Sequence, residues 1–139
     1  MQMPVAPATA FKRALDCLLA YDIDAYADLF AENAVIEWPF APPDLQARVE
    51  GRNAIRSAVS RNLEMSRAGG RRLVGLHDVV VREVAGGNEV VVEFEVEILR
   101  PDGDTDRLPY VHILRVDEAG KIASLRDYFG EKTVRMRSG

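Results

Sequence analysis

The sequence predicts an α+β fold in which three N-terminal helices pack on a curved, mainly antiparallel sheet. Two observations lead to this prediction. Apolar residues recur at helical spacing in the first half of the chain and at every second position in the second half. The alternating stretches are joined by connections as short as "AGGN", "PDGD" and "DEAG", which carry the residues that tight turns require. Helices that cover one face of such a sheet form a cone-shaped domain with a pocket between the two layers.

Three amphipathic segments are expected to form the helices. The first covers residues 8–20, the second residues 22–33 and the third residues 52–65. Asp22 is the expected N-cap of the second helix, because its carboxylate can accept a hydrogen bond from a free backbone N–H. Asn33 is expected to close that helix, and the glycines of "RAGG" to end the third.

One short strand is expected between the second and third helices, and four longer strands after the third. The short strand lies in "AVIEWPF" and stops at Pro39, and the proline-rich loop "APPDLQARVE" follows. The longer strands are expected at residues 71–85, 89–100, 106–117 and 121–130. Because their connections are short, we expect them to form an antiparallel meander.

Length and composition indicate one globular domain. With 139 residues, of which 47% are hydrophobic, the chain can bury one core. We expect the domain at residues 11–132, between loose tails at 1–10 and 133–139. The net charge of -4 disfavours nucleic acid or an anionic membrane surface as a partner. The one cysteine, Cys17, excludes an internal disulfide and is compatible with the cytoplasmic location that we expect.

Three stretches resemble a known family. "LFAENAVIEWPF", "EGRNAI" and "VDEAGKIASLRDYFGE" are similar to the SnoaL-like and ketosteroid isomerase-like branch of the nuclear transport factor 2-like superfamily. The resemblance covers residues 11–132 in the expected order. It implies the cone-shaped fold and a homodimer packed through the outer face of the sheet. It leaves the reaction open, because this scaffold hosts isomerases, polyketide cyclases, epoxide hydrolases, dehydratases and proteins without chemistry.

The chemical groups of the steroid isomerases are absent at the matching positions. The general base of that family, an aspartate, corresponds to Trp38 in "IEWP". Its oxyanion tyrosine corresponds approximately to Ala14, and its second oxyanion acid to His112 in "VHILRV". A steroid isomerase of the usual mechanism is therefore not expected.

The closing motif is similar to that of the limonene epoxide hydrolase-like branch. The "W-R-D-Y-F-D" of that branch matches "LRDYFG", which implies a catalytic role for Asp127. Its second aspartate and an arginine come from the strand that matches residues 93–97, where this chain keeps carboxylates but has no arginine. The tyrosine and asparagine that hold the water correspond to Ile36 and Trp38. The water-activating site is thus incomplete.

Glu93, Glu95 and Glu97 form a row whose direction decides its role. The opposite face carries Val92, Phe94, Val96 and Ile98. The isomerase match places the apolar face in the pocket, and the hydrolase match places the glutamates there. Desolvating three like charges would strongly raise the pKa of some of them, whereas burying four apolar side chains is favourable by roughly 1.5–3 kcal/mol each. We therefore expect the glutamates to face outward, opposite arginines at 71–84, with at most Glu95 turned inward.

Asp127 and His112 are the candidate catalytic residues. Asp127 shares its strand face with Phe129, and burying an unpaired carboxylate among apolar neighbours is costly. The alternative is a charge at a sheet edge that pairs with an arginine. His112 lies on the neighbouring strand, where it would face Asp127 and could help to move a proton near neutral pH. The alternative for His112 is a hydrogen-bonded core histidine.

Seven further residues are expected to line the pocket. They are Trp38, Tyr110, Phe129, Phe30, Tyr26, Val59 and Glu95. Trp38 and Tyr110 would position the substrate, and the Trp38 indole N–H is free to donate one hydrogen bond. The alternative for the apolar members is plain core, and for Tyr26 we favour it.

These observations predict a cofactor-independent enzyme. It would isomerise, cyclise or open an epoxide in a small apolar metabolite by acid/base proton transfer. The alternative is a non-catalytic small-molecule-binding protein on the same scaffold. An interaction module would need an apolar outer sheet face, which the glutamate row disfavours. The two histidines lack the spacing of a zinc site, so no metal or other cofactor is expected, and neither is a nucleic-acid or membrane partner.

Overall fold

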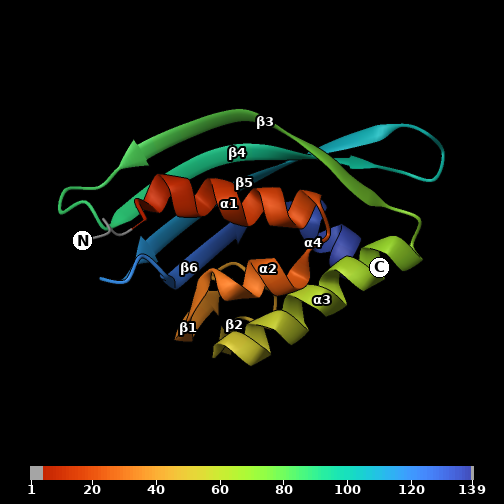
Figure 1. Ribbon diagram of the computed structural model, residues 1–139. Coiled ribbons are helices and arrows are strands. Elements are labelled where there is room, and N and C mark those ends of the chain that lie inside the picture. Colours follow the sequence, from red (N-terminus) through yellow and green to blue (C-terminus); the bar gives the residue numbers. More distant parts are fainter. Residues whose placement is uncertain (1–4, 139) are drawn as a thin grey trace.

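The computed structural model describes residues 5–138 (Figure 1). This part of the chain forms four helices: α1 (Pro7–Leu19), α2 (Ile23–Asp28), α3 (Arg52–Ala68) and α4 (Glu131–Ser138). It forms six strands: β1 (Phe30–Glu37), β2 (Arg48–Glu50), β3 (Arg72–Glu83), β4 (Glu89–Leu99), β5 (Thr105–Val116) and β6 (Ile122–Phe129). The predicted α+β class is confirmed.

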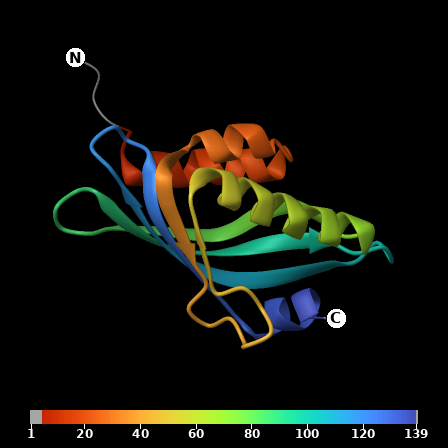
Figure 2. The same ribbon diagram turned by 90° about the horizontal axis from the view of Figure 1, so that it is seen from below.

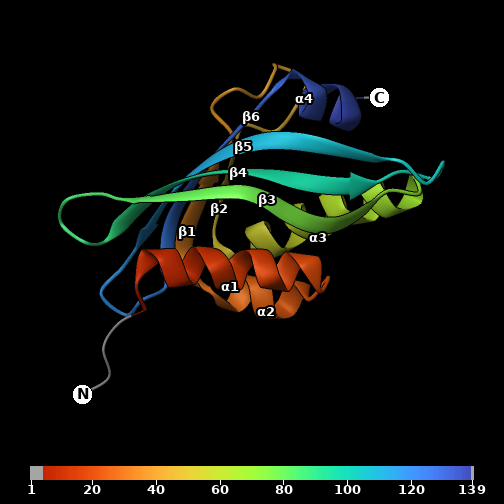
Figure 3. The ribbon, with the colours of Figure 1, turned by 90° about the horizontal axis from the view of Figure 1, so that it is seen from above.

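The strands form one curved sheet in the order β2-β1-β6-β5-β4-β3. β3 to β6 make the predicted antiparallel meander, in which each strand pairs with the next along the chain. β1 lies parallel to β6, and β2 is antiparallel to β1. In Figures 2 and 3, α4 lies next to the end of β6 and far from α1 and α2.

The first three helices bury their apolar stripes against the inner face of this sheet. α1 buries Phe11 and Leu15, each 4% exposed, and α3 buries Ile55 completely. Asp22 caps α2 as predicted, because its Oδ1 accepts a hydrogen bond from the backbone N–H of Ala25 at 3.1 Å. The helical spacing in the sequence therefore identified the faces that cover the sheet.

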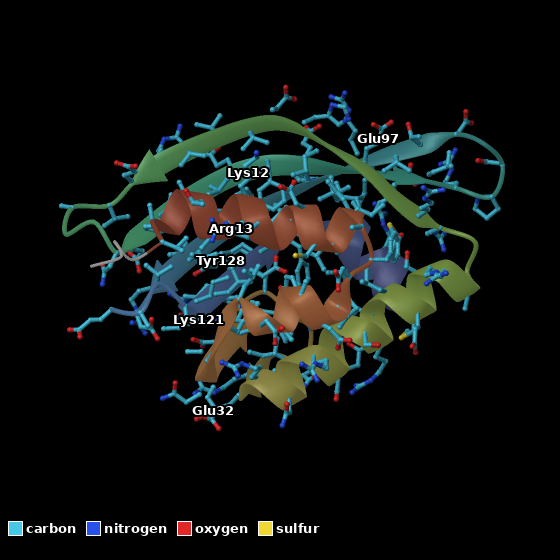
Figure 4. All side chains as sticks on the ribbon, viewed as in Figure 1. Lys12, Arg13, Glu32, Glu97, Lys121 and Tyr128 are labelled. Carbon is cyan, nitrogen blue, oxygen red and sulfur yellow. The ribbon has the colours of Figure 1, made fainter. Side chains whose placement is uncertain are left out.

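The glutamate row of β4 faces away from the helices, as predicted. The alternate residues Val90, Val92, Phe94, Val96 and Ile98 are all buried in the core. Glu97 lies on the outer side of the sheet in Figure 4, and its Oε1 is 2.6 Å from Nε2 of His77 on β3. Glu93 pairs with Arg82, one of the arginines expected opposite the row.

Glu95 does not reach the pocket, so the prediction of an inward turn is wrong. Its Oε2 lies 3.6 Å from Nη1 of Arg107 on the outer face of β5. The outer face offers Glu95 a cation and water, whereas the inner face would offer it only apolar neighbours.

The second helix ends earlier than the sequence predicted. α2 stops at Asp28, and Asn33 lies inside β1 rather than at a helix end. The cause is tertiary: Phe30 is fully buried and pairs with Ile122 of β6, and the Ile122 N–H donates to the carbonyl of Leu29 at 2.9 Å. Pairing with a distant strand outweighs the helical pattern of this segment.

The ordered structure extends past both predicted domain boundaries. α1 begins at Pro7, where a proline suits the first turn, and Ala10 is 2% exposed, so residues 7–10 are not a loose tail. At the other end, α4 takes the place of the predicted tail, with Thr133 1% exposed and Met136 packed against the core. The short strand β2 inside the proline-rich loop was also not predicted.

Candidate functional site

A cavity of about 640 Å³ lies between the inner face of the sheet and the helices. This volume is typical of small-molecule sites. Its apolar wall consists of Leu15, Leu18, Leu45, Leu63, Leu73, Phe94, Val96, Ile98, Leu108, Phe129 and Met136. The pocket that the fold class predicts is thus present, and the helices α1, α3 and α4 and the sheet all contribute to its wall.

Asp127 and His112 meet in the wall of this cavity. They are directly opposite each other on β6 and β5, and Nε2 of His112 lies 3.4 Å from Oδ1 of Asp127. Their side chains are only 13% and 9% exposed, respectively. The predicted juxtaposition of the two residues is confirmed. The alternative of an arginine partner for Asp127 is excluded, because none of the ion pairs in the described residues joins Asp127 to an arginine.

The two oxygens of Asp127 have different surroundings. Oδ2 accepts a hydrogen bond from Nε1 of Trp38 at 3.2 Å. Oδ1 is buried and makes no hydrogen bond in the described structure, because the contact with His112 at 3.4 Å is an ion-pair contact without hydrogen-bond geometry. A buried acceptor without a hydrogen bond is unfavourable, so Oδ1 is the atom best placed to take a proton or a hydrogen bond from a ligand.

Aromatic rings hold the imidazole of His112 in place. The ring centroids of Phe94, Phe11 and Tyr110 lie 4.8, 5.9 and 6.2 Å from that of His112, all in edge-to-face orientations. Such contacts fix a ring more tightly than aliphatic packing does. His112 therefore presents Nε2 to Asp127 in a defined direction.

Trp38, Tyr110 and Phe129 line the cavity as predicted. Trp38 follows directly after β1, and its indole N–H donates a hydrogen bond to Asp127. The hydroxyl of Tyr110 accepts a hydrogen bond from Oγ1 of Thr133 at 3.4 Å, which ties the sheet to α4. These three residues surround the Asp127–His112 pair.

Phe30, Tyr26 and Val59 are buried but do not line the cavity, so their predicted role in its wall is wrong. Phe30 and Tyr26 pack on each other, with ring centroids 5.0 Å apart, in the core formed by α2, α3 and β1. Burial raises the pKa of Tyr26, and the nearby charge of Asp127 raises it further. The phenol is therefore protonated at physiological pH.

Several residues of the wall were not predicted. Thr133 and Met136 come from α4, which the sequence pattern did not reveal because its eight residues are mostly polar. Arg71 and Tyr21 line the cavity near the junction of α3 and β3. Nothing in the local pattern separates an inward arginine from the many outward ones.

Residues 5–138 contain neither a cluster of metal-ligating side chains nor a membrane-spanning helix. No group of three or more His, Cys, Asp or Glu side chains in this range could hold a metal ion. Within the same range, no helix has the length and apolar character needed to cross a membrane.

Comparisons with known proteins agree with this architecture. The chain is 27% identical over 123 residues to the uncharacterized protein YesE of Bacillus subtilis (strain 168), covering 88% of this chain and 80% of that protein. A B. subtilis structure provisionally named an isomerase superposes with a TM-score of 0.80 at 25% identity, covering 93% of this chain and 89% of the other.

A second solved structure is that of the epoxide hydrolase/cyclase-like enzyme SalBIII, described in pyran ring formation in the polyether salinomycin. It gives a TM-score of 0.68 at 22% identity and covers 91% of this chain and 92% of its own, a likeness that shows the fold. The family model for the SnoaL-like domain matches residues 11–125. The chain therefore belongs to the SnoaL-like domain family, within the nuclear transport factor 2-like superfamily.

Proposed function

We propose that this protein is a cofactor-independent acid/base catalyst that isomerises, cyclises or opens an epoxide in a small, largely apolar metabolite. One observation carries the proposal: a buried carboxylate oxygen without a hydrogen bond, Oδ1 of Asp127, lies 3.4 Å from Nε2 of His112 in the wall of an apolar cavity. Membership in the SnoaL-like family and the similarity to SalBIII and to the B. subtilis structure support a reaction of this type.

The pair would act by moving a proton between substrate atoms. Oδ1 of Asp127 takes a proton from a carbon next to a carbonyl, and the electrons of the broken C–H bond form the enolate. Nε2–H of His112 donates a hydrogen bond to the oxygen on which negative charge develops. Asp127 then returns the proton to a different carbon, so that the enzyme ends in its starting state. The apolar residues around the pair lower the local dielectric constant, which strengthens both interactions.

Opening of an epoxide would use the same two residues, with His112 as the general acid and Asp127 as the general base. His112 in its protonated form gives the Nε2 proton to the epoxide oxygen as the C–O bond breaks. Asp127 accepts the proton of the attacking hydroxyl, which forms the new C–O bond. An internal hydroxyl of the substrate would give a ring, and water would give a diol.

Trp38 is a positioning residue in this scheme. Its indole N–H donates a hydrogen bond to Oδ2 of Asp127 at 3.2 Å, so that Oδ1 is the oxygen that remains available to the substrate. Oδ1 is thus left available as a base. In the non-catalytic alternative the same oxygen would only accept a hydrogen bond from a bound ligand, and the effect of Asp127→Asn on turnover distinguishes the two roles.

Asp127→Asn tests the proposal directly. The amide keeps the shape of the carboxylate and an oxygen for Trp38 but loses basicity, so we expect turnover to fall by about 10²–10⁴-fold. The readouts are hydrogen–deuterium exchange of 2-tetralone in D₂O, followed by NMR, and opening of 1,2-epoxydecane. Glu95→Gln is the matched control, because it removes a carboxylate from the outer face of the sheet.

We expect the rate of Glu95→Gln to equal the wild-type rate with whichever of the two probes the wild type converts. Two results would contradict the proposal. One is a wild-type rate equal to that of buffer with both probes, and the other is an Asp127→Asn rate equal to the wild-type rate. Either result would favour a non-catalytic binding protein.

A further inference from the structure

The cavity contains a second polar region, at the junction of α3 and β3. Arg71 lines the cavity there, and its Nε is buried without a hydrogen-bond partner. None of the ion pairs within the described residues includes Arg71. A Cβ atom at Gly69 would lie 3.2 Å from Nη1 of Arg71, so the guanidinium packs against the last turn of α3. The residue as a whole is partly buried, and its buried Nε–H is unfavourable without an acceptor unless a ligand supplies one.

Arg71 is not needed to cap α3. The backbone N–H groups of Gly69, Gly70 and Arg71 donate to the carbonyls of Met65, Arg67 and Ser66 at 3.1, 2.9 and 2.9 Å, respectively. These bonds satisfy carbonyls of the last helical turn. The buried Nε–H of Arg71 therefore has no acceptor at this helix end.

Tyr21 adds a second donor to the same region. Its hydroxyl accepts a hydrogen bond from the backbone N–H of Leu73 at 2.9 Å, and its own proton has no acceptor within the described residues. Leu73 and Arg71 are two residues apart at the start of β3, and both line the cavity with Tyr21. The hydrogen bond from Leu73 therefore holds the phenol oxygen at the start of β3, in the same part of the cavity wall as Arg71.

The second polar region is far from the Asp127–His112 pair. His112 pairs with Val92 on β4, and Leu73 pairs with Ile98 of the same strand. The six residue steps from Val92 to Ile98 separate the two strand positions by roughly 20 Å. The wall between the two regions is apolar and includes Phe94, Val96 and Leu108.

Charge in this region is positive and unpaired. Arg61 also lines the cavity, and no ion pair joins Arg61 or Arg71 to Asp44, the one other acidic residue of the wall besides Asp127. The Asp127 carboxylate would repel an anion at the opposite end. An elongated ligand with one anionic end therefore has one favoured direction in the cavity.

We infer that Arg71 and Tyr21 bind the carboxylate of an amphipathic acid whose apolar chain fills the cavity and whose reacting group lies at Asp127. Guanidinium binds carboxylate through two parallel hydrogen bonds, and the phenol donates a third. This inference rests on the proposed function for the reaction, but the binding itself is independent of it.

Trp38 provides the measurement, because it is the one tryptophan of the chain and lines the cavity. Decanoate and 1-decanol have the same chain length and differ in the charged end group. Titration of Trp38 fluorescence is expected to show decanoate binding about tenfold more tightly than decanol. Arg71→Gln is expected to abolish this preference. Arg72→Gln is the matched control, because the neighbouring side chain is exposed on the strand, and it is expected to keep the preference.

Equal wild-type affinity for decanoate and decanol would overturn the inference, as would an undiminished preference in Arg71→Gln. If Arg71→Gln does not fold, Arg71→Lys serves instead: its ammonium lacks the paired donors, so a reduced preference supports the inference and an unchanged one overturns it. Asp127→Asn is expected to keep the preference for decanoate. A failure of the proposed chemistry is therefore distinguishable from a failure of the anion site.

Discussion

At the scale of single residues, Asp127 is held from two directions. Trp38, just after β1, fixes one oxygen at 3.2 Å, and His112 on β5 lies 3.4 Å from the other. The structure thus separates an oxygen that is used for positioning from one that faces a ligand. Tyr21 is held in a similar way elsewhere in the cavity wall: its hydroxyl oxygen accepts a hydrogen bond from the Leu73 N–H, and its hydroxyl proton remains available to a ligand.

The outer-face pair of His77 and Glu97 gives a prediction about acid stability. The hydrogen bond from His77 is the main cause that lowers the pKa of Glu97. A lowered folded-state pKa means stability that is present above the unfolded pKa and lost as the pH falls through the folded value. His77→Ala is expected to raise the pKa of Glu97 towards its ordinary value and to flatten the fall in unfolding free energy below about pH 5.

Urea unfolding between pH 3 and 6, together with a carbon NMR titration of the Glu97 carboxyl group, checks this prediction. Glu97→Gln is the control, because it removes the titrating group and should flatten the profile in the same pH range. An unchanged pKa of Glu97 in His77→Ala would show that another group, such as Arg107, controls its titration.

The sequence predicted the Asp127–His112 contact because both residues lie on strands joined by one tight turn. The turn "DEAG" makes the two strands antiparallel neighbours, which alternation along the sequence indicates, but a bulge next to the turn, between Arg115 and Val116, sets the final register in which His112 lies opposite Asp127. The hydrogen bond between Trp38 and Asp127 joins residues 89 positions apart, so no local pattern encodes it. Arg71 was missed for a related reason, since the direction of its side chain depends on how α3 ends.

At the scale of elements, the turn between β5 and β6 also contacts Val5, in the segment just before α1. Gly120 has φ +80°, and a Cβ atom there would lie 2.5 Å from the backbone nitrogen of Val5. Gly87, in the turn between β3 and β4, has a similar φ of +79° but has no atom within 4 Å of an added Cβ. Alanine at either position would have the same unfavourable left-handed backbone, but only at Gly120 would it also collide with Val5. Comparing the two substitutions therefore measures the steric cost separately from the backbone cost.

Gly120→Ala is expected to lower the free energy of unfolding more than Gly87→Ala. Both alanines have the left-handed backbone, which costs about 1–2 kcal/mol. Gly120→Ala must also displace the segment before α1, which adds about 1–3 kcal/mol. Urea denaturation of the two variants measures the difference. Equal losses would mean that Val5 does not pack firmly against this turn.

The elements that sequence reasoning missed depend on distant partners. β1 begins at Phe30 because β6 pairs with it, and β2 exists because three residues of the proline-rich loop pair with β1. α4 has little amphipathic character of its own and is held by Thr133 and Met136. The long elements were predicted because their periodicity is local, and these short ones were not because their stability is tertiary.

At the scale of the whole molecule, the cavity depends on a sheet that is covered by helices at both ends. α1 and α3 supply one part of its wall, and α4 supplies Thr133 and Met136. The parallel placement of β1 beside β6 brings Trp38 to Asp127. The fold thereby places an acid/base pair in one part of the cavity wall and Arg71 in another, just before a strand position of β3 that lies roughly 20 Å along β4 from that of His112.

The most direct test of this account is a double-mutant cycle on Asp127 and His112, measured as the exchange or opening rate of whichever probe the wild type turns over. If the two residues move a proton as one unit, Asp127→Asn and His112→Gln each lower the rate by about 10²–10⁴-fold. The double variant is then expected to be no slower than the slower single variant. Losses that multiply, or a single variant that keeps the wild-type rate, would contradict the account.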